Sequence, residues 1–360
     1  IEGGLGRPEA WANERRIYAR EEMRRGDNRL AYDLAAHHQL TEGSDFADLE
    51  WLAGFIALRK LAQPRVALNH FLALANGVET PISLGRAYYW MGRAYEDLGE
   101  AEQAKAAYTE GARHQTSYYG LLAAERAGVA SDPALGGQGP LADWQVPEIT
   151  GSLLREASAL LLAAGQPIQA EMFLMQMADV QSVAGLNLMG AMLESRNDAH
   201  MQVMLGKRAA GRGIVLPRYY YALHPLAQMT LPVARNLGID DHDQARLLSD
   251  WRHNATLGSA YLAQLARRFS GNVVLIAVGY NAGPGRAEQW IDLFGDPRDP
   301  EVDVVDWVET IPYRETRNYV QRVAESLPVY RARLGVNPRP VPFSAELGGS
   351  TLLPLSPESE

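Results

Sequence analysis

Residues 88–108 read YYWMGRAYEDLGEAEQAKAAY, with aromatic residues near both ends and small residues between them. The small residues Gly92 and Ala104 would let two neighbouring helices approach closely, and the tyrosines would fill the gaps beside them. A helical hairpin of this kind cannot bury its inner face alone and must stack on similar neighbours. The stretch therefore predicts one unit of a helical stack.

The spacing of the small and aromatic residues resembles the tetratricopeptide repeat. A weaker copy lies about one repeat earlier, at Gly54, Ala67 and Phe71. The matching positions of the stronger copy are Tyr88, Met91, Gly92, Tyr95, Ala104 and Tyr108. We predict an all-α fold that begins with a tetratricopeptide-like α-solenoid, or superhelix.

The predicted solenoid covers residues 1–212, because helical spacing of apolar residues continues to about Arg212. A Gly/Pro-rich loop interrupts it at residues 130–147. Residues 213–233 contain three prolines and a run of three tyrosines, which predicts an extended or irregular linker.

A second helical domain is predicted over residues 234–334, with helices at about 251–269, 272–280, 286–294 and 314–333. Residues 335–360 are rich in proline, serine and glycine, so we predict a disordered or loosely draped tail.

Composition excludes several functional classes. The net charge is −9 over 360 residues, which disfavours a nucleic-acid partner. The chain has no cysteine, so thiol catalysis and cysteine-type zinc sites are excluded. His37 and His38 have no third ligand at zinc spacing, and we predict no metal site. The longest apolar run, residues 273–278, is too short to span a membrane.

Three segments of the second domain carry a resemblance to a known family. They are NATLGSAYL at residues 254–262, GYNAGP at residues 279–284 and IPYRETRNYV at residues 311–320. In this order they resemble the lysozyme-like domain of the soluble lytic murein transglycosylases. The solenoid, with SYYGL at residues 117–121, is similar to the ring-shaped superhelix of that family.

The resemblance implies an enzyme that binds peptidoglycan glycan strands and needs no cofactor. It also implies a periplasmic location, although no signal peptide is visible in the sequence. Protein partners could bind the solenoid surface.

Four residues are predicted to bind substrate: Tyr280, Asn281, Glu315 and Tyr319. Tyr280 offers a ring face and a hydroxyl, and Asn281 offers an amide for hydroxyl or acetamido groups. Glu315 lies in the first turn of a helix and shares a face with Tyr319, which the resemblance places beside the sugar cleft. The alternatives are that Tyr280 is core, that Asn281 caps a helix, and that Glu315 only pairs with a nearby arginine or backbone amide.

The sequence departs from the family at the catalytic acid. The family carries a Glu-Ser pair and a Gly-Leu-Met-Gln turn ahead of the NATLGSAYL segment, and this block is absent between Val233 and Ala234. Glu194-Ser195 precedes the linker and Glu325-Ser326 follows all the motifs, so neither pair is assigned the catalytic role. Leu226 to Met229 lies on the wrong side of the junction to replace the turn. The catalytic residue is therefore left unassigned.

The resemblance implies a mechanism with one glutamate, whereas ordinary glycosidases use two carboxylates. That glutamate protonates the oxygen of the bond between MurNAc and GlcNAc and then deprotonates the muramic 6-hydroxyl, which closes a 1,6-anhydro ring.

Three hypotheses follow from the absence of the catalytic block between Val233 and Ala234. The protein is an active transglycosylase whose printed sequence omits a stretch, or an inactive peptidoglycan-binding or scaffold protein, or an adaptor that holds protein partners. We favour the first, because a true deletion would deprive the helix at 274–280 of its packing partner.

Overall fold

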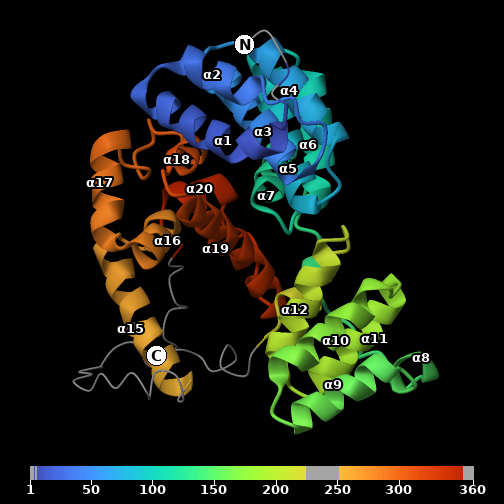
Figure 1. Ribbon diagram of the computed structural model, residues 1–360. Helices are drawn as coiled ribbons and strands as arrows, with labels where there is room; N and C mark the ends of the chain where they lie inside the picture. Colours follow the sequence, from blue (N-terminus) through green and yellow to red (C-terminus); the bar gives the residue numbers. More distant parts are fainter. Residues whose placement is uncertain (1–3, 5, 224–250, 352–360) are drawn as a thin grey trace. The chain divides into compact units, whose positions relative to one another are not determined.

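The computed structural model describes residues 4, 6–223 and 251–351, and these residues form helices and no β-strand (Figure 1). The predicted all-α superhelical fold is confirmed. The chain divides into two compact units. The first unit comprises residues 1–224 and 326–338, and the second comprises residues 225–325 and 339–360.

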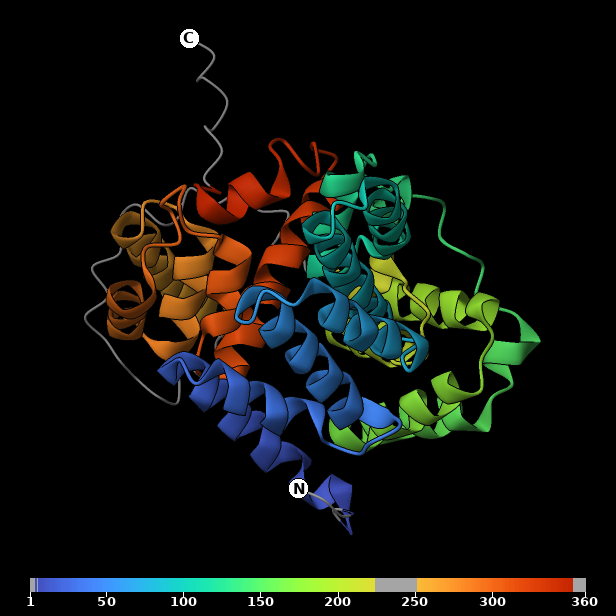
Figure 2. The same cartoon turned by 90° about the horizontal axis from the view of Figure 1, so that it is seen from above.

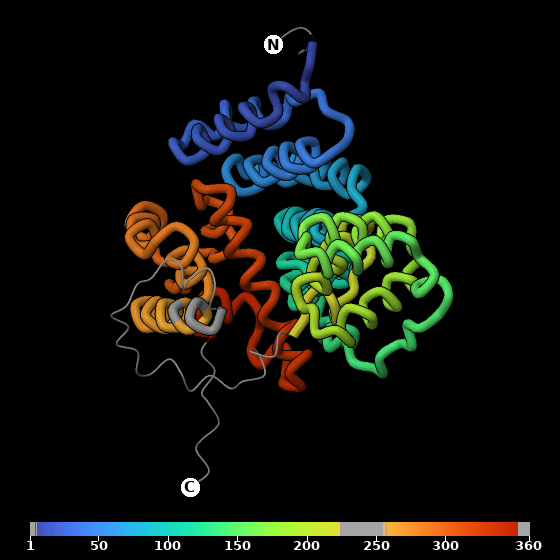
Figure 3. Tube along the Cα trace, turned by 60° about the horizontal axis from the view of Figure 1, so that its bottom comes forward, coloured from blue at the N-terminus to red at the C-terminus, as the bar shows by residue number. Residues whose placement is uncertain are grey.

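In the first unit, helices α1 to α7 pack against their neighbours in chain order, and helices α9 to α12 form a second such run (Figures 2 and 3). Its α-helices are α1 (Pro8–Arg25), α2 (Asn28–Ala36), α3 (Gly43–Arg59), α4 (Pro64–Asn76), α5 (Pro81–Asp97), α6 (Ala101–Gly111), α7 (Tyr118–Ala127), α8 (Pro147–Thr150), α9 (Leu153–Ala163), α10 (Pro167–Asp179), α11 (Val183–Ser195), α12 (Ala199–Ala210) and α13 (Pro217–Tyr220). Two short 3-10 helices, η1 (Ala112–His114) and η2 (Pro133–Gly136), complete it.

Close contacts between a helical glycine and an aromatic ring recur through the first unit. A Cβ atom built on Gly92 would lie 2.4 Å from the ring of Tyr108, and one built on Gly54 would lie 2.4 Å from the ring of Phe71. Real Cβ atoms do not approach so closely, so only glycine admits the ring at either position. Both copies of the predicted small-residue pattern therefore act as the sequence indicated.

A cluster of aromatic side chains forms the core between α3, α4, α5 and α7. The Trp90 ring lies at its centre and is fully buried. The rings around it, with centroids 5.2–6.2 Å away, are those of Trp51, Phe55, Phe71, Tyr89 and Tyr119.

The linker prediction is wrong for residues 217–220, which form the helix α13. Tyr219 and Tyr221 are buried in the first unit, and the Tyr221 hydroxyl donates to the carbonyl oxygen of Thr116 at 3.2 Å. Proline at the first position of α13 fits a helix start, which explains why the proline-rich composition was misleading here. Residues 224–233 of the predicted linker lie outside the described residues.

The helices of the second unit surround one apolar helix. They are α15 (Trp251–Arg268), α16 (Val273–Ala282), α17 (Pro284–Phe294), α18 (Val304–Thr310), α19 (Arg314–Arg333) and α20 (Phe343–Gly348). Residues 314–325 of α19 belong to this unit, and its last residues belong to the first unit. Helix α16 contacts α15, α17 and α20, and its side chains Val274, Leu275 and Val278 are fully buried.

The prediction of a loose tail is wrong for residues 343–348. Phe343 and Leu347 of α20 are buried, and the Asn272 amide donates to the carbonyl oxygens of Leu347 and Gly349 at 2.8 Å. These contacts fix α20 on the start of α16, and the sequence signal is the pair of apolar residues four apart. Within the part of the chain that the structure describes, no helix is long and apolar enough to cross a membrane.

Candidate functional site

The end of α16 and the start of α19 bring the four predicted substrate-binding residues together. Asn272 caps the start of α16, and its side chain accepts from the backbone N–H of Leu275 at 2.9 Å. It ends at Gly283, where φ is +92°, a value that favours glycine. Tyr280 and Asn281 occupy its last turn, where the helix leaves the core. Glu315 and Tyr319 lie one turn apart on α19.

Tyrosine rings form an exposed row at this place. Tyr280 is 42% exposed, and its ring is nearly parallel to that of Tyr319, with 6.2 Å between centroids and 7° between planes. On its other side the ring of Tyr261 lies 5.8 Å away, and the Tyr261 hydroxyl donates to the carbonyl oxygen of Gly279 at 3.3 Å. Burial and the neighbouring Tyr280 raise the pKa of the Tyr319 phenol, so it stays protonated and remains a hydrogen-bond donor.

A short hydrogen-bond chain fixes the Asn281 amide. The Thr316 hydroxyl donates to Oδ1 of Asn281 at 2.6 Å, and Nδ2 of Asn281 lies 3.5 Å from the Glu315 carboxylate. An ionised carboxylate only accepts hydrogen bonds, so the amide must turn its NH2 group toward Glu315 and its oxygen toward Thr316. Among the residues that the structure describes, the second N–H of this group has no acceptor, so it could donate to a ligand.

A buried ion pair supports the start of α19. The guanidinium of Arg317 lies 3.5 Å from the Glu309 carboxylate, and both side chains are almost fully buried. Arg317 also donates to the carbonyl oxygen of Ile311 at 2.9 Å, and Gln321 donates to Glu309 at 2.9 Å. Removing one partner of such a pair leaves an uncompensated buried charge. The pair therefore holds the turn from which Glu315 and Thr316 project.

The structural alternatives raised for Tyr280 and Asn281 do not describe what is found. Tyr280 is exposed rather than part of the core, and the Asn281 side chain bonds to α19 rather than capping its own helix. Arg317 forms an ion pair with Glu309, and for Glu315 the alternative of pairing with an arginine or a backbone amide stays open. The binding roles of the four residues remain predictions.

Sequence reasoning missed three residues of this surface. Tyr261 lies in the NATLGSAYL segment and Thr316 lies in the IPYRETRNYV segment, but neither was assigned a role. A signal was present for Tyr261 and Thr316, because each belongs to a segment that carries the family resemblance. Arg286, which follows the GYNAGP turn, was not considered, because one exposed arginine carries no pattern.

The junction between Val233 and Ala234 lies outside the described residues, as does the segment from Leu226 to Met229. The two glutamates that were rejected as catalytic have structural partners. Glu194 forms an ion pair with Arg218 at 2.6 Å, and Glu325 forms one with Arg322 at 2.6 Å. The catalytic residue stays unassigned.

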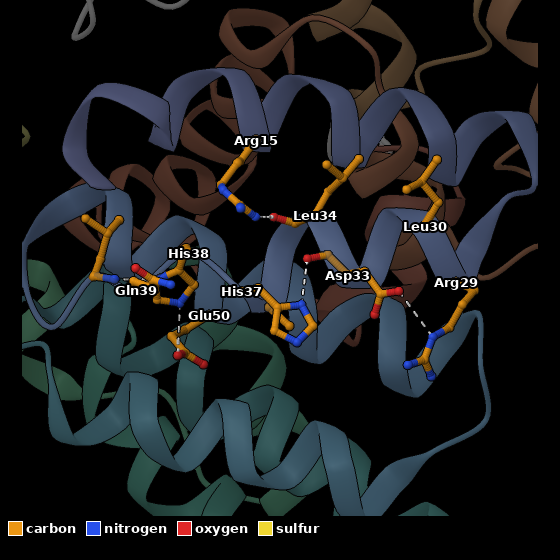
Figure 4. A pocket seen from close by; sticks show the side chains of 11 residues that line it. Arg15, Arg29, Leu30, Asp33, Leu34, His37, His38, Gln39 and Glu50 are labelled. Carbon is orange, nitrogen blue, oxygen red and sulfur yellow. Dashed lines mark hydrogen bonds and ion pairs between the residues drawn. The ribbon is translucent and has the colours of Figure 1, made fainter. Parts of the chain in front are cut away.

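A cavity of about 670 Å3 lies in the first unit, against α2 and α3 (Figure 4). At one side of it, Nε2 of His38 lies 3.0 Å from the Glu50 carboxylate, and Nδ1 of His70 lies 2.6 Å from the other oxygen. His37 bonds instead to the backbone oxygen of Asp33. Burial alone would raise the pKa of the Glu50 carboxyl, but the hydrogen bonds from the two histidines outweigh it and hold the pKa at about 2. Glu50 is therefore an ionised anchor between helices and not a proton donor.

Comparison with known proteins matches the part of this site that precedes residue 302 and does not reach Glu315, Thr316 and Tyr319. Residues 226–301 match the family model described as "Transglycosylase SLT domain". The matched segment contains Tyr261, Tyr280, Asn281 and Arg286.

Curated relatives match over a similar stretch. The chain is 36% identical over 91 residues to the soluble lytic murein transglycosylase of Escherichia coli K12, which is 25% of this chain and 14% of that protein. It is 37% identical over 82 residues to the protein of the same name from Salmonella typhimurium, which is 23% of this chain and 12% of the relative. The matches thus span a small part of the relatives.

Two solved structures share the fold over most of the chain. An inactive mutant of the lytic transglycosylase Slt from Pseudomonas aeruginosa matches with a TM-score of 0.61 and 21% identity, covering 92% of this chain and 59% of the other. The 70 kDa soluble lytic transglycosylase from Escherichia coli matches with a TM-score of 0.54 and 18% identity, covering 91% and 63%. The resemblance predicted from the three segments is confirmed.

Proposed function

We propose that this chain, which resembles the soluble lytic murein transglycosylases, is a lytic transglycosylase of the bacterial cell wall. It would cleave the β-1,4 bond between MurNAc and GlcNAc and leave a 1,6-anhydro-MurNAc end. One observation carries the proposal: the GYNAGP turn, inside the matched transglycosylase segment, meets the start of α19 in an exposed surface of tyrosines and polar groups. A periplasmic location and a role in cell-wall turnover belong to the same proposal.

The described residues include an aromatic ring, a hydrogen-bond donor and a hydrogen-bond acceptor that are suited to binding a sugar chain. The exposed ring of Tyr280 presents an apolar face with a polar hydroxyl, a combination suited to a pyranose ring. The Asn281 amide, held by Thr316, would donate to an acetamido or hydroxyl oxygen, and Glu315 would accept from a hydroxyl. A few fixed polar groups beside an aromatic surface orient a ligand without large contact area.

The acid that breaks the bond is not among the residues assigned here. A single glutamate that acts first as acid and then as base needs a raised pKa, which an apolar pocket provides. The buried Glu309 carboxylate is held by Arg317 and Gln321. We therefore assign Glu309 a supporting role at the start of α19 and not the role of the acid.

The first experiment measures the products of murein digestion. Purified sacculi are incubated with the protein, and soluble fragments are analysed by liquid chromatography and mass spectrometry. We expect muropeptides with 1,6-anhydro ends, which lack the elements of water that a hydrolytic product contains. Only reducing ends would indicate a hydrolase, and the absence of all products would contradict the enzymatic proposal.

An inactive peptidoglycan-binding or scaffold protein is the second candidate, and the direct junction of Val233 and Ala234 favours it. Tryptic digestion separates the two. The peptide Tyr219 to Arg235, YYYALHPLAQMTLPVAR, exists only if the junction is continuous. Its detection, together with binding to sacculi but no release of fragments, would favour the binding protein. Larger peptides with additional residues after Val233 would favour the enzyme.

A further inference from the structure

Arg286 lies next to the proposed sugar site and faces an exposed ring. It occupies the first turn of α17, and its guanidinium carbon lies 5.8 Å from the centroid of the Tyr313 ring. Tyr313 is 45% exposed, and its ring meets the buried Trp290 edge-on at 5.3 Å. The ring is thus fixed by packing from within while its outer side faces solvent beside the arginine.

Arg286 differs from several other arginines of the second unit in having no acidic partner among the described residues. Four other arginines of the second unit, Arg268, Arg298, Arg317 and Arg322, each form an ion pair with a carboxylate. Among the residues that the structure describes, Arg286 has no carboxylate partner; it donates to the neutral Gln289 side chain at 2.5 Å. What sets Arg286 apart is that this positive charge lies beside the ring of Tyr313, which is only two residues from Glu315 of the proposed sugar site.

Arg286 and Tyr313 each lie close in sequence to a residue of the proposed sugar site. Arg286 follows Asn281 by five residues across the Gly283 turn, and Tyr313 precedes Glu315 by two residues. Two residues of extended chain span at most about 7 Å. Because Glu315 in turn reaches Asn281, both components of the Arg286–Tyr313 pair border the same surface.

We propose that Arg286 and Tyr313 form a subsite for a carboxylate carried by the glycan strand. The inference rests on the proposed function, and it adds which residues would bind the charged group of the substrate. A guanidinium presents parallel N–H groups that match the two oxygens of a carboxylate, and an aromatic ring beside it limits its rotation. Muramic residues carry such groups either on the lactyl ether or on an attached peptide, whereas a GlcNAc oligomer carries none.

Binding of three probes by the full chain tests the subsite. The probes are a GlcNAc oligomer, glycan strands stripped of peptide, which expose lactyl carboxylates, and strands that retain peptide. Affinities are measured by isothermal titration calorimetry for the wild type, Arg286→Gln and Arg286→Lys. Arg267→Gln is the matched control, because Arg267 is also an exposed arginine of the second unit.

We expect Arg286→Gln to bind carboxylate-bearing strands about tenfold more weakly, the size of one exposed charge-assisted pair, and to bind the GlcNAc oligomer unchanged. Arg286→Lys should recover part of the loss, since lysine keeps the charge but not the planar fork. The loss should shrink at high salt, because exposed charges are screened. An effect with stripped strands identifies the lactyl carboxylate, and an effect only with peptide-bearing strands identifies the peptide.

Equal effects of Arg286→Gln on all three probes, or none, would overturn the subsite while leaving the sugar site intact. Tyr280→Ala separates the two ideas, because it should weaken binding of every probe. If the wild type binds no probe, the proposed function fails, and the subsite fails with it. Since Arg286 is on the surface, thermal melting curves of the variants should coincide with that of the wild type.

Discussion

Tyrosine has opposite roles in the two units of this chain. In the first unit Tyr89, Tyr108 and Tyr119 are 3% exposed or less and fill spaces between helices. In the second unit Tyr280 and Tyr313 are 42% and 45% exposed and lie at helix ends. The same side chain thus packs a core in one place and lies on an exposed surface in the other.

The neighbours of each ring explain the difference. Tyr108 lies against Gly92, where the missing side chain leaves room for the ring between two helices. Tyr280 lies where α16 ends at Gly283, so no further turn of that helix covers it. An aromatic residue opposite a helical glycine therefore indicates packing, whereas one just before a helix-ending glycine indicates a surface.

The largest expected effect is on the core of the first unit. Replacing Trp90 by alanine would remove a fully buried ring that contacts several other rings, and we expect a loss of about 3–5 kcal/mol in the free energy of unfolding. Urea denaturation followed by circular dichroism measures it. Trp90→Phe should cost much less, because the indole N–H has no hydrogen-bond partner among the described residues.

Tyr280→Ala provides the matched contrast, since it removes an exposed ring. We expect its unfolding free energy to change by less than about 1 kcal/mol while sugar binding weakens. If Tyr280→Ala destabilises the protein as much as Trp90→Ala does, the distinction between packing and binding tyrosines is wrong.

A smaller effect is expected from the anchor Glu50. Its folded pKa, about 2, is below the ordinary value of 4.5. The ionised carboxylate therefore contributes stability that is fully present above about pH 4.5 and is lost as the pH falls toward 2. We expect Glu50→Gln to cost about 2 kcal/mol at pH 7 and to flatten the fall in stability across this window.

Unfolding curves between pH 2 and pH 7 measure this dependence. Glu21→Gln is a suitable control, because Glu21 pairs with Arg25 on the exposed face of α1 and should contribute less than about 1 kcal/mol. An unchanged pH profile in Glu50→Gln would show that the histidine contacts do not depress the pKa of this carboxyl.

Periodicity and motif order were sufficient to predict most of the architecture. The small-residue pattern at Gly92 and Ala104 predicted the stacked hairpins, because one missing side chain determines how closely two helices pack. The four residues predicted to bind substrate come from two segments 34 residues apart, and the structure brings those segments together. The residues most informative about the fold were therefore those whose type restricts the backbone conformation or the distance between packed helices.

Tertiary contacts explain what the sequence did not reveal. Residues 343–348 have the composition of a tail, yet Asn272, 75 residues away from Leu347, supplies the hydrogen bonds that hold them. Thr316 was missed for a similar reason, since its partner is on another helix. Such pairings depend on distances between segments, which local composition does not contain.

The smallest effect, and the most selective one, is expected at Thr316. This buried hydroxyl donates to Asn281, so it acts as a positioning residue that orients the amide toward the ligand. Thr316→Val keeps the shape of the side chain but removes the donor. We expect a loss of about 1 kcal/mol in stability and a several-fold weaker affinity for the GlcNAc oligomer, because the amide could then rotate.

Thr316→Ser distinguishes positioning from packing, since it restores the hydroxyl while removing a methyl group. Calorimetric binding of the GlcNAc oligomer should return to the wild-type affinity in the serine variant even though its stability is somewhat reduced. If binding instead follows stability across the two variants, Thr316 only packs. The orientation of Asn281 would then have to come from the contact with Glu315 alone, which at 3.5 Å is at the limit of a hydrogen bond.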